Sequence, residues 1–316
     1  MTEFPQLNGF RGGGGIIRLI GHRGARGVMP ENTMEGFAFT YRIGVFVFEF
    51  DVVLTRDHIP VITHNHRLAN AATRAPDGNW KTGAEPKVAD LTFSELQTLD
   101  VGGLDGQSEY GQRFPDQAFM SGVRIPRLCD LLDMAAQPEH ADMHLLLELK
   151  SDPDVKDDTG ARAQVVALVV KEVRKRHLEP RTVLHSFDWD LLDECRRQAP
   201  EMPTSYLSEL PGNVDEPGED SAKLVGPDYA ALTVSVPQAI KDAGGQMWCP
   251  YYMDVTQDLV SEAHALGLLV STWTVNDKAD IEAMIDARVD GIVSDYPGRV
   301  QHCLLNRGMH WRDGGS

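Results

Sequence analysis

Hydrophobic and polar positions follow two alternating periods along most of the chain. Short aliphatic and aromatic runs, such as residues 16–22, 45–55 and 268–276, predict buried strands. Amphipathic segments, such as residues 161–178 and 256–267, predict helices between them. Strands that alternate with helices form right-handed βαβ units around a parallel sheet, and about eight such units predict an α/β fold, a (β/α)8 TIM barrel. An open doubly wound sheet is the alternative arrangement.

Two regions depart from this alternation. Residues 1–15 are polar and rich in glycine, and they predict a flexible leader in front of a single barrel domain over residues 16–316. Residues from about 67 to 124 are rich in Gly, Asp, Asn and Gln, and contain one short helical piece. Thr92 and Glu95 have the spacing of a capping box at its start. We interpret this region as an insertion after the early strands.

The charge balance narrows the choice of partners. The chain has 30 Lys and Arg against 47 Asp and Glu, a formal net charge of −17. Nucleic acids and anionic membrane surfaces should repel such a protein, so we expect it to bind neither. A substrate that carries phosphate would have to be held by local positive charge or by a metal ion.

The cysteines and the hydropathy of the chain give information about the cellular location of the protein. The four cysteines are far apart in the sequence and form no C-x-x-C pair, which is typical of reduced thiols in a cytoplasmic protein. The amino-terminal segment lacks the basic region and apolar run of a secretory signal. No window is apolar over the about 18 residues that a membrane span needs. These features predict a cytoplasmic protein without stable membrane insertion.

Ionisable and polar side chains gather at the predicted carboxyl ends of the strands. In a barrel these ends form the face that carries chemistry. Burying such groups is costly unless they are paired or bind a metal. The residues at these ends are His22, Arg23, Glu49, Asp51, His64, Glu148, Lys150, His185, Ser186, Trp273, Asn276, Ser294 and Asp295.

Three carboxylates in this set predict a metal site. Glu49 and Asp51 are two residues apart on one strand, so both should face the barrel interior. Together with Glu148 they offer oxygen ligands without a nearby cysteine, which favours Mg²⁺ or Ca²⁺ over zinc. The alternative is a structural ion-pair network, for example between Glu49 and Arg23.

Two histidines are candidates for proton transfer. Imidazole titrates near neutral pH, so His22 and His64 beside carboxylates suit acid–base catalysis, although each alone could be structural. The guanidinium of Arg23 offers two parallel donors to a phosphate, or a salt bridge to Glu49 or Glu31. Trp273 could form an apolar wall for a substrate or pack in the barrel mouth.

These residues occur within short motifs that resemble one family. GHRG followed by PENT, then FEFDVVLTRDHIPVITHN, LLLELK, STWTVN and DGIVSDYP run in order through the chain. They resemble the glycerophosphodiester phosphodiesterase family, whose fold is a (β/α)8 barrel with a small insertion. The resemblance implies three sets of roles: acid–base catalysis by His22 and His64, divalent-metal binding by Glu49, Asp51 and Glu148, and substrate binding by Arg23, Lys150 and Trp273.

The activity implied is metal-dependent hydrolysis of a small glycerophosphodiester to glycerol 3-phosphate and an alcohol, as part of lipid and glycerol metabolism. Two alternatives stay open: a phospholipase D-like enzyme that acts on lysolipids, and an inactive member that only binds glycerophosphodiesters. Asn65 follows His64 where the family commonly has Asp, which removes a charge beside a catalytic position. Phe48 stands where the family often has a smaller aliphatic residue, on the face that should point to the helices.

Overall fold

Eight parallel strands of the described residues close into a barrel. The structure, a computed structural model, describes residues 4–155, 158–210 and 226–314. β1 pairs with both β2 and β9, which closes the ring. The barrel strands are β1 (Arg18–Gly21), β2 (Val47–Leu54), β4 (His144–Leu149), β5 (Thr182–Ser186), β6 (Thr204–Ser208), β7 (Met247–Pro250), β8 (Leu269–Thr272) and β9 (Gly291–Ser294).

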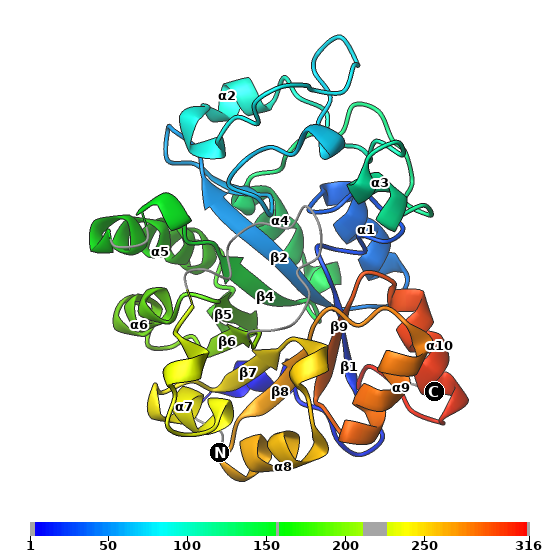
Figure 1. The fold of residues 1–316 in the computed structure, drawn as a ribbon, viewed down its shortest axis with the longest axis vertical. Coiled ribbons are helices and arrows are strands. Elements are labelled where there is room, and N and C mark those ends of the chain that lie inside the picture. Colours follow the sequence, from blue (N-terminus) through cyan, green and yellow to red (C-terminus); the bar gives the residue numbers. More distant parts are fainter. Residues whose placement is uncertain (1–3, 156–157, 211–225, 315–316) are drawn as a thin grey trace.

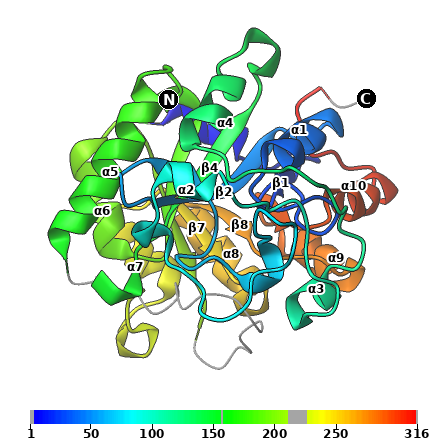
Figure 2. The same ribbon diagram turned by 90° about the horizontal axis from the view of Figure 1, so that it is seen from above.

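Helices surround this ring, as Figures 1 and 2 show from two directions. They are α1 (Met34–Arg42), α4 (Leu128–Ala135), α5 (Thr159–Arg174), α6 (Trp189–Gln198), α7 (Val236–Asp242), α8 (Gln257–Ala265), α9 (Lys278–Ala287) and α10 (Pro297–Asn306). The predicted TIM barrel is thereby confirmed, and the open sheet is excluded. The short strand β3 (Pro60–Ile62) lies outside the parallel ring, because it pairs antiparallel with the end of β2.

The two faces of β2 separate packing from chemistry. Phe48 and Phe50 point outward and meet the ring of Phe37 on α1, with centroids 6.1 and 5.9 Å away. Because side chains alternate along a strand, Glu49 and Asp51 face the interior instead. α1 begins only at Met34, after Thr33 accepts a hydrogen bond from the backbone of Gly36, so Pro30 lies in the preceding turn rather than in the helix.

The amino-terminal segment differs from the flexible leader that the sequence predicts. Residues from Pro5 to Gly9 form a short 3-10 helix. Leu7 and Phe10 are buried among inward-facing side chains of the barrel, including Ile20 and Met247. The apolar side chains of this amino-terminal segment cover apolar side chains inside the barrel. The free energy gained by burying them outweighs the preference of the local sequence for disorder. Residues 1–3 of this leader lie outside the described part.

The region between β3 and α4 contains only short elements, η2 (Asn70–Ala72), η3 (Val88–Asp90), α2 (Phe93–Leu96) and α3 (Glu109–Arg113). The predicted capping box is present, since Thr92 accepts from the backbone of Glu95 and the Glu95 carboxylate accepts in return. In Figure 2 this segment, cyan to green, crosses in front of the strands. It packs on its own apolar cluster, which includes Leu68, Leu96 and Ile125.

Two further observations concern the chain as a whole. Among the described residues, no helix has the length and apolar character needed to cross a bilayer. Cys129, Cys195, Cys249 and Cys303 are free thiols, and all but Cys129 are buried.

Candidate active site

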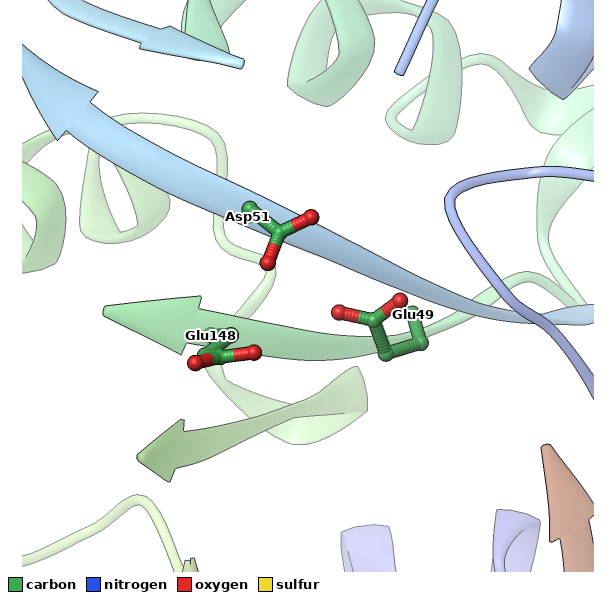
Figure 3. Close-up of side chains that lie close together, drawn as sticks. All are labelled: Glu49, Asp51 and Glu148. Atoms are coloured by element: carbon green, nitrogen blue, oxygen red, sulfur yellow. The ribbon is translucent and has the colours of Figure 1, made fainter. Parts of the chain in front are cut away.

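Three carboxylates from two neighbouring strands form the centre of the site. Glu49 and Asp51 project from β2, and Glu148 projects from β4 directly beside Asp51 in the strand register. Figure 3 shows the three side chains gathered over these two strands. One oxygen from each lies within 4.8 Å of the others, and all three residues are buried. The arrangement follows from the strand pairing, because register partners on adjacent strands project to the same side.

This cluster fits a divalent cation. Glu49 Oε1 and Asp51 Oδ1 are buried and have no hydrogen-bond partner among the described residues. Burial, together with the negative charges of Asp51 and Glu148, raises the pKa of Glu49 well above its usual range. Burial and the charge of Asp51 also raise the pKa of Glu148 to about 7, against the opposing effect of Lys150. A hard cation bound by these oxygens would relieve both the repulsion and the desolvation.

Two basic side chains lie against the carboxylates. Lys150 Nζ is 3.0 Å from Glu148 Oε1 and 3.5 Å from Asp51 Oδ1. Arg23 Nε is 3.4 Å from Asp51 Oδ2. Burial alone would raise the pKa of Asp51, but the positive charges of His64, Lys150 and Arg23 hold that pKa below its usual range. Asp51 is therefore the carboxylate most firmly kept ionised.

Arg23 occupies a strained turn directly after β1. Its φ of 49° lies in the left-handed region, and Gly24 follows with φ of 86°. This geometry aims the backbone N–H of Arg23 at Glu49 Oε2, 3.1 Å away, while its guanidinium donates to Glu31 Oε1 at 3.1 Å. Of the two salt bridges considered as alternatives for Arg23, the one with Glu31 is present, whereas the contact with Glu49 is a backbone hydrogen bond.

His22 is oriented by a buried aspartate. Its Nδ1 lies 2.7 Å from Asp295 Oδ1. Asp295 also accepts from Arg26 Nε at 2.8 Å and from Asn276 Nδ2 at 2.7 Å. An ionised carboxylate can only accept, so Nδ1 carries the proton and Nε2 is left toward Glu49 Oε2, 3.8 Å away. Burial lowers the pKa of His22, an effect that Asp295 opposes and that Arg23 and Arg26 reinforce.

His64 follows β3 and also lies near the carboxylates. Its Nδ1 meets the side-chain oxygen of Asn65. Its Nε2 lies 4.0 Å from Asp51 Oδ1. The neighbouring Asn32 donates from Nδ2 to Asp51 Oδ2 at 2.9 Å, so the second oxygen of this carboxylate is also held in place.

A cavity at the carboxyl ends of the strands connects these groups; we call it the barrel cavity. One wall is apolar, because the ring of Trp273 packs edge-on against Phe187 at 5.4 Å and donates from Nε1 to Cys249 O at 3.0 Å. Trp273 therefore both packs in the mouth and lines the cavity. The lining includes His22, Arg23, Glu49, His64, Glu148, Lys150, His185, Phe187 and Trp273. Thus seven of the eight predicted site residues line this cavity, and Asp51 lies among them by its contacts.

Sequence reasoning placed some further residues at strand ends without giving them a role. Asp295 and Asn276 orient His22, and the only sequence signal was their position after a predicted strand. His185 lines the cavity in a buried position, where burial lowers its pKa to about 3, so it is neutral. The contacts of Arg26 and Asn32 were not predicted. Asn32 belongs to the PENT motif but was given no role, and Arg26 was not considered.

Comparison with known proteins gives a consistent result. The model of the glycerophosphoryl diester phosphodiesterase family matches residues 22–299. A glycerophosphodiester phosphodiesterase from Caldanaerobacter subterraneus subsp. tengcongensis is 26% identical over 283 residues, covering 88% of this chain and 94% of that protein. Among solved structures, a protein from Silicibacter pomeroyi assigned to the glycerophosphoryl diester phosphodiesterases is 58% identical, with a TM-score of 0.91 and coverage of 98% and 100%.

A more distant solved structure shares the fold. A phosphodiesterase from Oleispira antarctica, solved in complex with the product sn-glycerol-3-phosphate, is 22% identical with a TM-score of 0.67. The alignment covers 92% of this chain and 97% of that one. At this identity the likeness concerns the barrel itself.

Proposed function

Because the chain belongs to the glycerophosphoryl diester phosphodiesterase family and is therefore a hydrolase of glycerophosphodiesters, we propose that it releases glycerol 3-phosphate and an alcohol by histidine acid–base catalysis at a divalent metal site. The observation that carries the proposal is the barrel cavity, which His22 and His64 both line and where each histidine is near a carboxylate of the buried cluster. A glycerophosphodiester is the small-molecule substrate.

Glu49, Asp51 and Glu148 would hold Mg²⁺ or Ca²⁺. The ion, when bound, would neutralise phosphate charge and lower the pKa of a hydroxyl or water next to it. Arg23 and Lys150 would supply the remaining positive charge to the phosphate oxygens. Both residues contact the carboxylates that would hold the ion, which supports this role. Trp273 would pack against the glycerol carbons on the apolar wall.

We assign the base to His22 and the acid to His64. Asp295 holds a proton on Nδ1 of His22, so Nε2 is free of a proton and can accept one. The glycerol 2-hydroxyl gives its proton to His22 as its oxygen attacks phosphorus, and the bond from phosphorus to the alcohol oxygen breaks. Asp51, 4.0 Å from His64 Nε2, favours the charged imidazole that gives its proton to the departing alcohol. Water then opens the cyclic phosphate with the two histidines in reversed roles.

We also place the enzyme in the cytoplasm, where deacylated phospholipid headgroups could be used as a source of glycerol 3-phosphate. The free cysteines support this location, because reduced thiols persist in that compartment.

The test is release of glycerol 3-phosphate from glycerophosphoethanolamine by the purified protein with Mg²⁺, with Ca²⁺ and with EDTA. We expect release that EDTA stops, and loss of that release in Glu49→Gln and Asp51→Asn. Glu139→Gln is the matched control, because Glu139 is an exposed carboxylate just before β4. Turnover that persists in EDTA or in both variants would overturn the metal assignment. Release of ethanolamine from lysophosphatidylethanolamine alone would favour the lysolipid alternative instead.

A further inference from the structure

A second cavity opens beside the barrel cavity, under the segment between β3 and α4; we call it the insertion cavity. Arg23 and His64 line both cavities, so the two meet at the residues proposed to hold phosphate and to protonate the departing alcohol. A diester with its phosphorus at this junction has two arms. If the glycerol lies against Trp273 in the barrel cavity, the other arm must extend toward the insertion cavity.

Two residues that line the insertion cavity have buried acceptor oxygens that receive no hydrogen bond from the described residues. Asn32 Oδ1 and Gln117 Oε1 are buried, and neither has a hydrogen-bond partner among the described residues. Both residues line this cavity. Such orphaned oxygens are costly to bury, so each requires a donor from water or from a ligand.

The identity of these two oxygens is fixed by what the amide nitrogens do. Asn32 Nδ2 donates to the Asp51 carboxylate at 2.9 Å. Gln117 Nε2 donates to the backbone carbonyl of Arg26 at 2.7 Å. Both partners can only accept, so turning either amide over would set oxygen against oxygen. The atom without a hydrogen-bond partner is therefore an acceptor oxygen in both of these lining residues.

Residues of both charges line the insertion cavity. Glu31 and Glu85 lie there beside Arg23 and Arg67. Arg23 donates to Glu31, and Arg67 donates to the backbone carbonyl of Glu85 at 3.0 Å. The rest of the lining includes apolar side chains, among them Leu68 and Leu104. An alcohol with a short carbon stem and a terminal N–H or O–H would match both parts of this surface.

We propose that the insertion cavity is the subsite for the departing alcohol, and that Asn32 and Gln117 select alcohols that carry a hydrogen-bond donor, such as an ammonium or a second hydroxyl. This inference rests on the proposed diesterase function. An alkyl arm would cover the two oxygens without satisfying them, and a site built to accept a donor discriminates strongly against an analogue that lacks it. Through Gln117, the segment between β3 and α4 thus contributes to the choice of headgroup.

The test compares three diesters of glycerol 3-phosphate: the ethanolamine ester, the n-propyl ester of nearly the same size, and the methyl ester, whose alcohol is the shortest of the three and carries no further donor. The readout is kcat/KM for the first two, each divided by the value for the methyl ester. In Gln117→Leu we expect the ethanolamine-to-propyl ratio to fall about tenfold relative to the wild type, the factor for one hydrogen bond to a charged donor. Comparing enzymes cancels the intrinsic difference between the two leaving groups.

Two further variants complete the design. Gln112→Leu is the matched control, because Gln112 is an exposed glutamine on α3; its ratio should equal that of the wild type. Ala72→Leu adds volume to the lining of the insertion cavity, and should lower turnover of the ethanolamine and propyl esters relative to the methyl ester. Unaltered ratios in both Gln117→Leu and Ala72→Leu would overturn the subsite while leaving the diesterase function standing. Failure of the wild type on all three esters would overturn the diesterase function itself.

Discussion

The hydrogen bond between Asp295 and His22 allows a demanding test of the proposed catalytic role. Asp295 is fully buried and lies directly after β9. Its two oxygens receive donors from His22, from Asn276 and twice from Arg26, at 2.8 and 3.0 Å. Asp295→Asn keeps the size of the side chain but leaves one acceptor oxygen for these donors. The amide N–H₂ must then face at least one of them, and the proton on His22 Nδ1 is no longer secured.

The expected loss has two parts of different size. Removing one partner of the buried Asp295–Arg26 pair should cost about 3–5 kcal/mol of stability. For 316 residues the unfolding entropy is about 0.66 kcal mol⁻¹ K⁻¹, so the midpoint of thermal unfolding should fall by about 5–8 °C. Loss of a positioned general base should lower kcat by about 10²–10⁴-fold. Nearly all molecules of the variant should still be folded at 25 °C, so destabilisation alone cannot account for this loss of kcat.

A second aspartate, at the other end of β9, provides the control. Asp290 precedes β9, as Asp295 follows it, and accepts from Gly12 N at 3.0 Å and from His264 Nε2 at 2.8 Å. Asp290→Asn should therefore lower the melting temperature while kcat on glycerophosphoethanolamine stays within about twofold. Both variants are compared by calorimetry and by turnover at 25 °C. The reasoning fails if Asp295→Asn is destabilised but keeps kcat within about threefold of the wild type.

Three other predictions concern the metal, a surface histidine and the amino-terminal segment. Mg²⁺ or Ca²⁺ at about 100 times its Kd should stabilise the wild type by about 2.7 kcal/mol, and should not stabilise Glu49→Gln. The increase in melting temperature caused by the ion should become smaller from pH 8 to pH 6, because protons compete with the ion for Glu148, whose pKa is about 7. The hydrogen bond to Asp290 raises the pKa of His264 in the folded protein. The contribution of this pair to the free energy of unfolding is therefore fully present below about pH 6.5, and is lost as the pH rises through the pKa of His264 in the folded state. His264→Gln should cost about 0.5–1 kcal/mol at pH 5.5 and much less at pH 9 in urea unfolding, a small value because the side chain is partly exposed. Phe10→Ala should lower stability by about 3–5 kcal/mol, whereas a flexible leader would give no change.

The residues at the carboxyl ends of the strands could be predicted from the sequence, because the alternation of side chains along a strand is a local property of the chain. Glu49 and Asp51 point to the same side of β2 because side chains alternate along a strand. The carboxyl ends of the parallel strands all lie on one face of the barrel, independently of the loop sequences. Seven of the eight predicted site residues line one cavity. Their individual roles in catalysis stay predictions, which the variants above address.

The remaining features depend on contacts that sequence patterns do not encode. The hydrogen bond of Asp295 to His22 spans 273 positions, and only closure of the barrel between β1 and β9 creates it. The buried place of Phe10 likewise depends on the apolar interior of the finished barrel. β3 has the composition of a barrel strand, but it pairs antiparallel with the end of β2 and leads into the insertion. In each case the outcome depends on tertiary packing, which the local sequence pattern does not determine.

Asn65, the departure from the family pattern, is compatible with an active enzyme. Its side-chain oxygen meets His64 Nδ1, and an amide oxygen accepts an N–H as a carboxylate does. The ring orientation and the proton on Nδ1 can therefore be kept, with Nε2 toward Asp51. What Asn65 removes is a negative charge. The cluster already contains three buried carboxylates, and the basic side chains of Arg23 and Lys150 are engaged with them. A fourth carboxylate beside His64 would add repulsion where the anionic diester must enter, so the amide keeps the orienting contact and lessens the electrostatic cost of binding phosphate.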